Sequence, residues 1–186
     1  MPARVEDFRA SRGGSRRKRA MAVPAILTLA VGVLVGCGGD GDEDPGELPL
    51  VADIAPAIAA VEAELGGPQD FFEVNATAQL INVFVATDGG TTATAYVYLD
   101  GELQPPAPPR DVSGGSTFGA DAVDFDPDVI FGGIADELDN PDVTQFVVVG
   151  GPGGAVQYSA FVMSSEGGVL DVLLDPNGAV LGVNPG

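Results

Sequence analysis

The stretch AAVEAELGGPQDFFEV, residues 59–74, decides the fold that we expect, because one periodicity replaces another within it. Before Gly66, apolar side chains recur in steps of three and four, which is typical of an amphipathic helix. After Pro68, Phe72 and Val74 alternate with polar residues, as in a half-buried strand. The Gly-Gly-Pro sequence between the two patterns ends a helix. The stretch therefore predicts a helix followed directly by a strand.

The predicted helix extends from this stretch toward the N-terminus. Asp53 is in position to cap its first turn, and Pro56 is tolerated there because the first backbone N–H groups of a helix have no partner within it. The apolar stripe of the helix consists of Ile54, Ile58, Val61 and Leu65. Such a stripe indicates that one side of the helix packs on another layer.

Two further strands are predicted toward the C-terminus, over residues 80–87 and 92–99. Both segments are rich in β-branched and aromatic residues. The sequence Asp88-Gly89-Gly90 between them favours a hairpin turn. A Pro- and Gly-rich stretch follows these strands.

A similar order of patterns then returns. Asp126-Pro127 is typical of an N-cap with a first-turn proline, the apolar stripe is Ile130, Ile134 and Leu138, and Asn140-Pro141 ends the helix. Strands are predicted over residues 144–149, 155–164, 169–174 and 179–183. The segments of the two halves correspond at an offset of roughly 73 to 78 residues. Duplication and convergent use of the same turn residues both explain this correspondence.

We therefore expect an α+β fold of two tandem helix-plus-antiparallel-strand repeats, with the helices packed on the antiparallel sheet. This order of elements loosely resembles the tandem helix-plus-sheet repeats of the β-lactamase-inhibitor protein type, without a shared motif that would imply a function. The expected segments are a signal (1–36), an acidic Gly-rich tether (37–49), a first repeat (50–104), a Pro/Gly-rich linker (105–125) and a second repeat (126–186).

The N-terminal segment is typical of an export signal. Basic residues crowd the first nineteen positions, and no charge occurs from Ala20 to Gly39. The apolar run ends in Leu34-Val35-Gly36-Cys37, which resembles the lipobox of the bacterial lipoprotein signal. This resemblance implies lipidation of the Cys37 thiol, cleavage between Gly36 and Cys37, and a lipid-anchored protein on the outer side of the cytoplasmic membrane. The alternative is an uncleaved signal anchor.

Cleavage would make the protein far more acidic than the net charge of −19 of the full chain. Seven of the eight basic residues and two of the 27 acids, Glu6 and Asp7, precede Cys37, so 25 acids would face Arg110 alone, a net charge of −24. Such a chain repels nucleic acid. We expect membrane attachment to depend on the lipid, and a protein partner to be an envelope protein or a cationic protein.

The residue types that the chain would keep after cleavage argue against an enzyme. The chain has no histidine, and its only cysteine is the expected lipid acceptor. After cleavage it has no lysine either, so the usual nucleophile–base pairs, Schiff bases and zinc sites built on histidine and cysteine are excluded. Paired carboxylates remain, and two acids suffice for glycoside or aspartic-protease chemistry. Asp88 lacks the following hydroxyl residue of an aspartic protease, which favours a hairpin role. We expect no cofactor.

The best metal candidate is the alternating set Asp124, Asp126 and Asp128. An EF-hand loop that began at Asp124 would have Val129 at its glycine position and Ala135 at its bidentate-acid position, so the calcium pattern fails twice. Capping of the helix explains these acids without an ion.

Three functions are compatible with these features. The first is a non-enzymatic module that binds a partner through the exposed sheet face or the Gly-rich loops. The second is a carrier of a lipid or small apolar ligand, lined by Phe71, Phe72, Phe84, Phe131, Phe146 and Phe161. The third is a surface protein that binds calcium weakly at the acid clusters.

Overall fold

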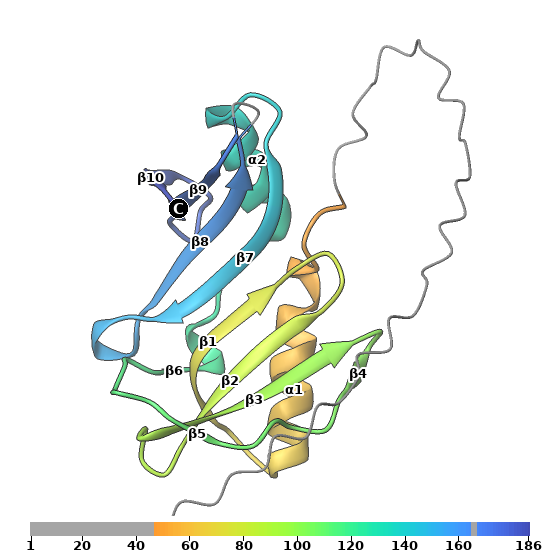
Figure 1. Ribbon diagram of the computed structural model, residues 1–186, viewed down its shortest axis with the longest axis vertical. Helices are drawn as coiled ribbons and strands as arrows, with labels where there is room; N and C mark the ends of the chain where they lie inside the picture. Colours follow the sequence, from red (N-terminus) through yellow and green to blue (C-terminus); the bar gives the residue numbers. More distant parts are fainter. Residues whose placement is uncertain (1–46, 165–166) are drawn as a thin grey trace, which may run out of the picture. The chain divides into compact units, whose positions relative to one another are not determined.

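The computed structural model describes residues 47–164 and 167–186. In these residues the fold is mixed: one antiparallel sheet of ten strands, with two α-helices packed against it (Figure 1). The helices are α1 (Ile54–Leu65) and α2 (Pro127–Glu137). The long strands are β1 (Asp70–Ala76), β2 (Ile81–Thr87), β3 (Thr92–Leu99), β7 (Asp142–Gly150), β8 (Val156–Met163), β9 (Val169–Leu174) and β10 (Val180–Pro185). The short ones are β4 (Glu102–Leu103), β5 (Arg110–Asp111) and β6 (Phe118–Gly119).

Helix α1 confirms the first predicted helix, but the predicted cap is wrong. A 3₁₀ turn over Val51–Asp53 leads directly into the helix, so Asp53 already has helical backbone angles and its side chain accepts no capping hydrogen bond. At the other end, Gly66 adopts the left-handed conformation (φ 81°) that ends helices. Leu65 is 42% exposed and does not belong to the buried stripe, which Ala57 completes instead.

Strand β1 departs from the predicted alternation. Phe71 and Val74 are both buried although three positions separate them, whereas Phe72 is half-buried. The register against β2 shifts between Phe71 and Glu73, which is the signature of a β-bulge. The bulge inserts one residue, so Phe71 and Val74 point to the same side of the sheet and Phe72 is free to face elsewhere.

Helix α2 begins as the sequence predicts. The Asp126 side chain accepts a hydrogen bond from the backbone N–H of Asp128 (3.0 Å), and Pro127 occupies the first turn. The helix ends earlier than expected, because Leu138 already has extended backbone angles. A Cβ on Gly133 would lie 1.8 Å from the carbonyl oxygen of Gly178, so this glycine lets the helix touch the turn between β9 and β10.

The strand order is β10-β9-β8-β7-β1-β2-β3-β4, so the two central strands are the first long strands of the two halves of the sequence. Across the β1–β7 pairing, Val74 lies opposite Val148 and Ala76 opposite Phe146, and all four are buried. The stripe residues of both helices belong to the same hydrophobic cluster. One core therefore runs along one face of the whole sheet.

Segment 105–125, which we expected to be a linker, contributes to this sheet. Strand β5 pairs with β3, and β6 pairs with β1. Phe118 is 1% exposed, and its ring lies 5.9 Å from that of Phe71, centroid to centroid. The segment thus supplies a core aromatic residue.

Candidate binding surface

The face of the sheet opposite the core, here called the open face, is the candidate functional surface. Side chains alternate between the two faces along a strand, and residues paired across strands share a face. From this register, the open face between the strand ends consists of Glu73, Asn75, Asn82, Phe84, Ala86, Ala93, Ala95, Val97, Gln145, Val147, Val149, Gln157, Ser159, Phe161, Asp171, Leu173, Gly182 and Asn184. Neither α1 nor α2 covers this face.

The composition of the open face is unusual for the solvated side of an antiparallel sheet, which normally carries polar residues. Nine of its residues are apolar: Leu173 is 37% exposed, Val147 is 5% exposed, and the others are half-buried, namely Phe84, Ala86, Ala93, Ala95, Val97, Val149 and Phe161. Glu73 and Asp171 are its only ionisable members. Within residues 47–164 and 167–186 no helix covers this largely apolar face, and a face of this kind is typical of an interaction site.

A short polar network crosses the centre of the open face. The amide nitrogen of Asn75 donates to a Glu73 carboxylate oxygen (2.7 Å), and the amide nitrogen of Asn82 donates to the Asn75 amide oxygen (2.9 Å). Asn75 is only 6% exposed. These bonds fix the orientation of both amides before any partner arrives, which lowers the entropy cost of binding.

A groove of about 320 Å³ lies at one end of the open face. Phe72 and Phe84 contribute aromatic rings to its wall, and the backbone of Gly114–Ser116 borders the other side. Gly150 must be a glycine here, because a Cβ would lie 2.2 Å from the Ser116 carbonyl oxygen. The groove gives the otherwise shallow face a recess that an apolar side chain can fill.

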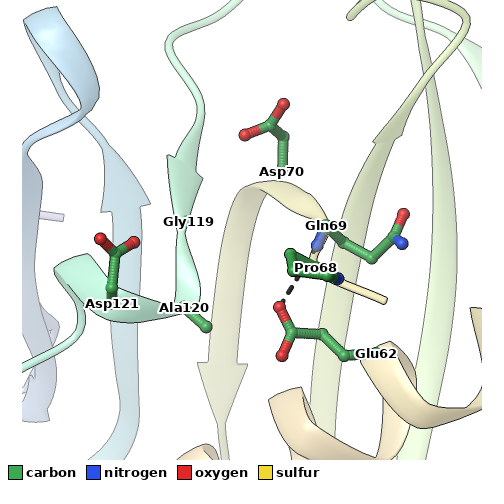
Figure 2. A pocket seen from close by; sticks show the side chains of 7 residues that line it. All are labelled: Glu62, Pro68, Gln69, Asp70, Gly119, Ala120 and Asp121. Carbon is green, nitrogen blue, oxygen red and sulfur yellow. Dashed lines mark hydrogen bonds between the residues drawn. The ribbon is translucent and has the colours of Figure 1, made fainter. Parts of the chain in front are cut away.

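A second hollow, of about 620 Å³, lies where the C-terminus of α1 meets the residues after β6, and three acids line it: Glu62, Asp70 and Asp121. Glu62 is engaged, because a carboxylate oxygen accepts the backbone N–H of Gln69 (3.2 Å). The carboxylate of Asp70 points away from that of Glu62 (Figure 2). In the described part of the chain, no three acids converge in a way that could hold a metal ion.

The predicted calcium candidates serve local structure. Asp126 caps α2, with Asp128 as its donor. The backbone N–H of Asp124 donates to the Tyr158 hydroxyl (3.1 Å), which in turn donates to the Asp124 carbonyl oxygen (3.4 Å). Burial raises the pKa of Tyr158, and the nearby Asp124 charge adds to this, while the backbone hydrogen bond opposes it. This cluster fastens the start of α2 to β8.

The phenylalanines that we expected to line a ligand space are divided between the two sides of the sheet. Phe71 and Phe146 are fully buried in the core, and Phe131 packs against it. Phe72 and Phe84 line the groove, and Phe161 is on the open face. The structure therefore does not bring the six together around one space.

The expected lipidation and cleavage residues, Gly36 and Cys37, lie outside the described residues. Within the described ranges, no helix has the length and apolar character needed to span a bilayer.

Asp88, expected in a hairpin, lies in the β2–β3 turn with φ 50°, and its carboxylate accepts a hydrogen bond from the Thr92 hydroxyl (3.0 Å).

Comparison with known protein families, with curated proteins and with solved structures finds no match to this chain. Sequence reasoning missed the Glu73–Asn75–Asn82 network, although one signal was present: an asparagine interrupts each of the apolar strands β1 and β2.

Proposed function

We propose that this protein is a lipid-anchored envelope lipoprotein that acts as a non-enzymatic binding module, and that its open face binds a protein partner. The observation that carries the proposal is the apolar sheet face that neither helix covers. Burial of such a surface is the main favourable contribution to protein association. The groove beside Phe72 and Phe84 would receive an apolar anchor of the partner.

The charges of the open face indicate the chemistry of the partner. Glu73 and Asp171 are the ionisable groups of the face, and the exported chain would carry a net charge of −24, as derived above from the acid and base counts. A partner with a positively charged rim would be attracted over a distance and would approach faster. We therefore propose an envelope protein with a basic contact surface.

We also propose that the two halves are copies of one structural unit. In each half, a helix precedes strands that pair consecutively, and the order of the sheet reads outward from the β1–β7 pair on both sides. Two equivalent units paired through their first strands would generate this order. Their joined face offers a larger binding surface than either unit alone.

Site-specific photo-crosslinking in living cells tests the binding proposal. A photoreactive residue at Gln157, which is exposed on the open face, is compared with one at Glu64, which is exposed on α1. We expect a discrete crosslinked product from position 157 and none from position 64. The double substitution Phe84→Ala and Asn82→Ala should abolish that product. Equal products from both positions, or none from position 157, would contradict the proposal.

The anchor has its own test. Cells are labelled with a palmitate analogue, and the wild type is compared with Cys37→Ser. We expect the label in the wild type and its loss in the variant, together with release of the variant from the membrane fraction. Label that persists in Cys37→Ser, or a variant that stays uncleaved and bound, would favour the signal anchor instead.

A further inference from the structure

The outer edge of β10 borders the open face at Leu173, and its backbone groups are not used by the open-face proposal. Strand β10 is the last strand on its side of the sheet and pairs only with β9 among the described residues. An unpaired strand edge exposes a row of backbone donors and acceptors, which is a template for another strand.

The pairing register shows which backbone groups of β10 face outward. The N–H of Gly186 donates to the Val169 carbonyl oxygen of β9 (2.8 Å). In an antiparallel pair, inward and outward residues alternate, so Asn184 also faces β9, whereas Val183 and Pro185 direct their backbone groups outward. Pro185 has no N–H, but its backbone faces away from β9, so no hydrogen bond between β9 and β10 is lost. Val183 presents a backbone N–H and C=O to an incoming strand.

Exposed apolar side chains gather at the same edge. Leu181 is 69% exposed, Val183 is 44% exposed, and Leu173 on the adjacent β9 is 37% exposed. Strand β10 itself has no charged residue. Natural edge strands usually carry a charge that discourages pairing, and this one lacks it.

The opposite edge of the sheet is protected. The segment after β4 runs along β3, where Gln104 donates to Val97 (2.8 Å) and Ala107 donates to Ala95 (2.9 Å). That segment contains Pro105, Pro106, Pro108 and Pro109, none of which has a backbone N–H to offer. The two edges therefore differ: four prolines follow the β3 edge, whereas β10 has a single proline, Pro185, at its end, and Val183 stays open to pairing.

Charge indicates which strand would bind. A depression of about 470 Å³ beside Val180 is lined by the acids Asp136 and Glu137 of α2. A second copy of this chain would bring further acids to this place, whereas lysine or arginine would find partners here.

We propose that the β10 edge binds an extended protein segment, in which apolar side chains alternate with lysine or arginine, as an additional strand of the sheet. Main-chain hydrogen bonds to Val183 would supply affinity, and the exposed Leu181 and Leu173 would contact the apolar side chains. The acids would select basic segments over acidic ones.

The test uses the full-length chain and two short peptides, one alternating valine with lysine and one alternating valine with glutamate. Amide hydrogen exchange by mass spectrometry should show slower exchange in residues 180–186 with the lysine peptide and no change with the glutamate peptide. Val183→Pro removes the outward N–H, and we expect it to weaken binding by about tenfold or more, while the matched control Val183→Thr keeps the N–H and changes affinity by less than about twofold.

Three results would overturn the proposal. The first is equal binding of both peptides. The second is unchanged binding by a folded Val183→Pro variant; if that variant does not fold, exchange in the wild type decides alone. The third is concentration-dependent protection of β10 without any peptide, which would mean that a second copy occupies the edge. The open-face crosslink at position 157 is independent of each of these results.

Discussion

The two halves of the described chain, residues 51–103 and 127–185, contain similar elements but stabilise them differently. Helix α1 starts from a 3₁₀ turn without a side-chain cap, whereas α2 starts at the Asp126 cap. Helix α1 packs on the strands β1, β2 and β4, whereas α2 touches the β9–β10 turn through Gly133. The two halves therefore share a hydrophobic pattern but differ in how the helix begins and in what the helix contacts.

The aromatic clusters are alike in one respect, because each half uses a ring from the segment between the halves. In the first half, Phe71 contacts Phe118, which comes from outside that half. In the second half, Phe146 and Tyr158 form a triangle with Phe125, which also comes from outside that half, with ring centroids 5.3 to 6.1 Å apart. Both clusters nevertheless belong to one core, so the comparison predicts that neither half unfolds alone.

The largest effect is expected from truncating these aromatic clusters. Phe146→Ala should lower the free energy of unfolding by about 3–5 kcal/mol, because a fully buried ring leaves a cavity that its neighbours only partly fill. Phe71→Ala should cost an amount in the same range. Urea unfolding followed by circular dichroism and by hydrogen exchange measures both. Two separate transitions in either variant would show that the halves unfold independently, against the shared core.

The contact between α2 and the β9–β10 turn gives a matched pair of glycine substitutions. Gly133→Ala places a methyl group against the Gly178 carbonyl and should destabilise the protein by about 1–3 kcal/mol. At Gly132 no atom lies within 4 Å of the added carbon, so Gly132→Ala should be neutral or stabilise by up to about 1 kcal/mol through helix propensity. Thermal unfolding compares the two. Equal effects of both substitutions would disprove the close contact.

The helix starts provide the next comparison. Asp126→Ala removes a capping hydrogen bond and should cost about 1 kcal/mol. Asp53→Ala removes a side chain that makes no such bond and should change stability by less than about 0.5 kcal/mol. Chemical denaturation at neutral pH measures the difference. A larger loss at Asp53 than at Asp126 would reverse the assignment of the caps.

The sequence predicts the local elements well, because their signals are local. Periodicity identified both helices and the long strands, and the Asp126-Pro127 pair marked the start of α2. The alternation of Phe72 and Val74 misled the prediction, since a bulge depends on a partner strand that sequence periodicity does not contain. The burial of Phe118 was missed for a similar reason: β6 acquires its core position only by pairing with β1.

The sequence predicted that a binding surface would lie on the sheet, but not which residues form it. An exposed sheet face follows from two helices on a sheet, and we expected binding there. Which side chains share that face depends on the register across seven long strands, and the pairing of β1 with β7 joins residues about seventy positions apart. The Asn75–Asn82 bond and the open β10 edge arise from this long-range order.

The smallest and most specific effect concerns Tyr158, whose hydroxyl joins β8 to the segment before α2. Tyr158→Phe removes both hydrogen bonds to Asp124 and should cost about 0.5–1.5 kcal/mol near neutral pH. Burial raises the pKa of Tyr158 in the folded protein, so folding favours its protonated form. The resulting stability is fully present below the unfolded pKa of about 10 and is lost as the pH rises through the folded value.

The wild type should therefore lose this contribution in alkaline solution, whereas Tyr158→Phe has no such proton to lose. Unfolding free energies measured from neutral to strongly alkaline pH should converge for the two proteins above about pH 10. A difference that stays constant over this range would mean that the hydroxyl ionises as easily in the folded chain as in the unfolded one. In that case burial would not favour the protonated form of Tyr158, and the contact with Asp124 would stabilise the start of α2 equally at neutral and alkaline pH.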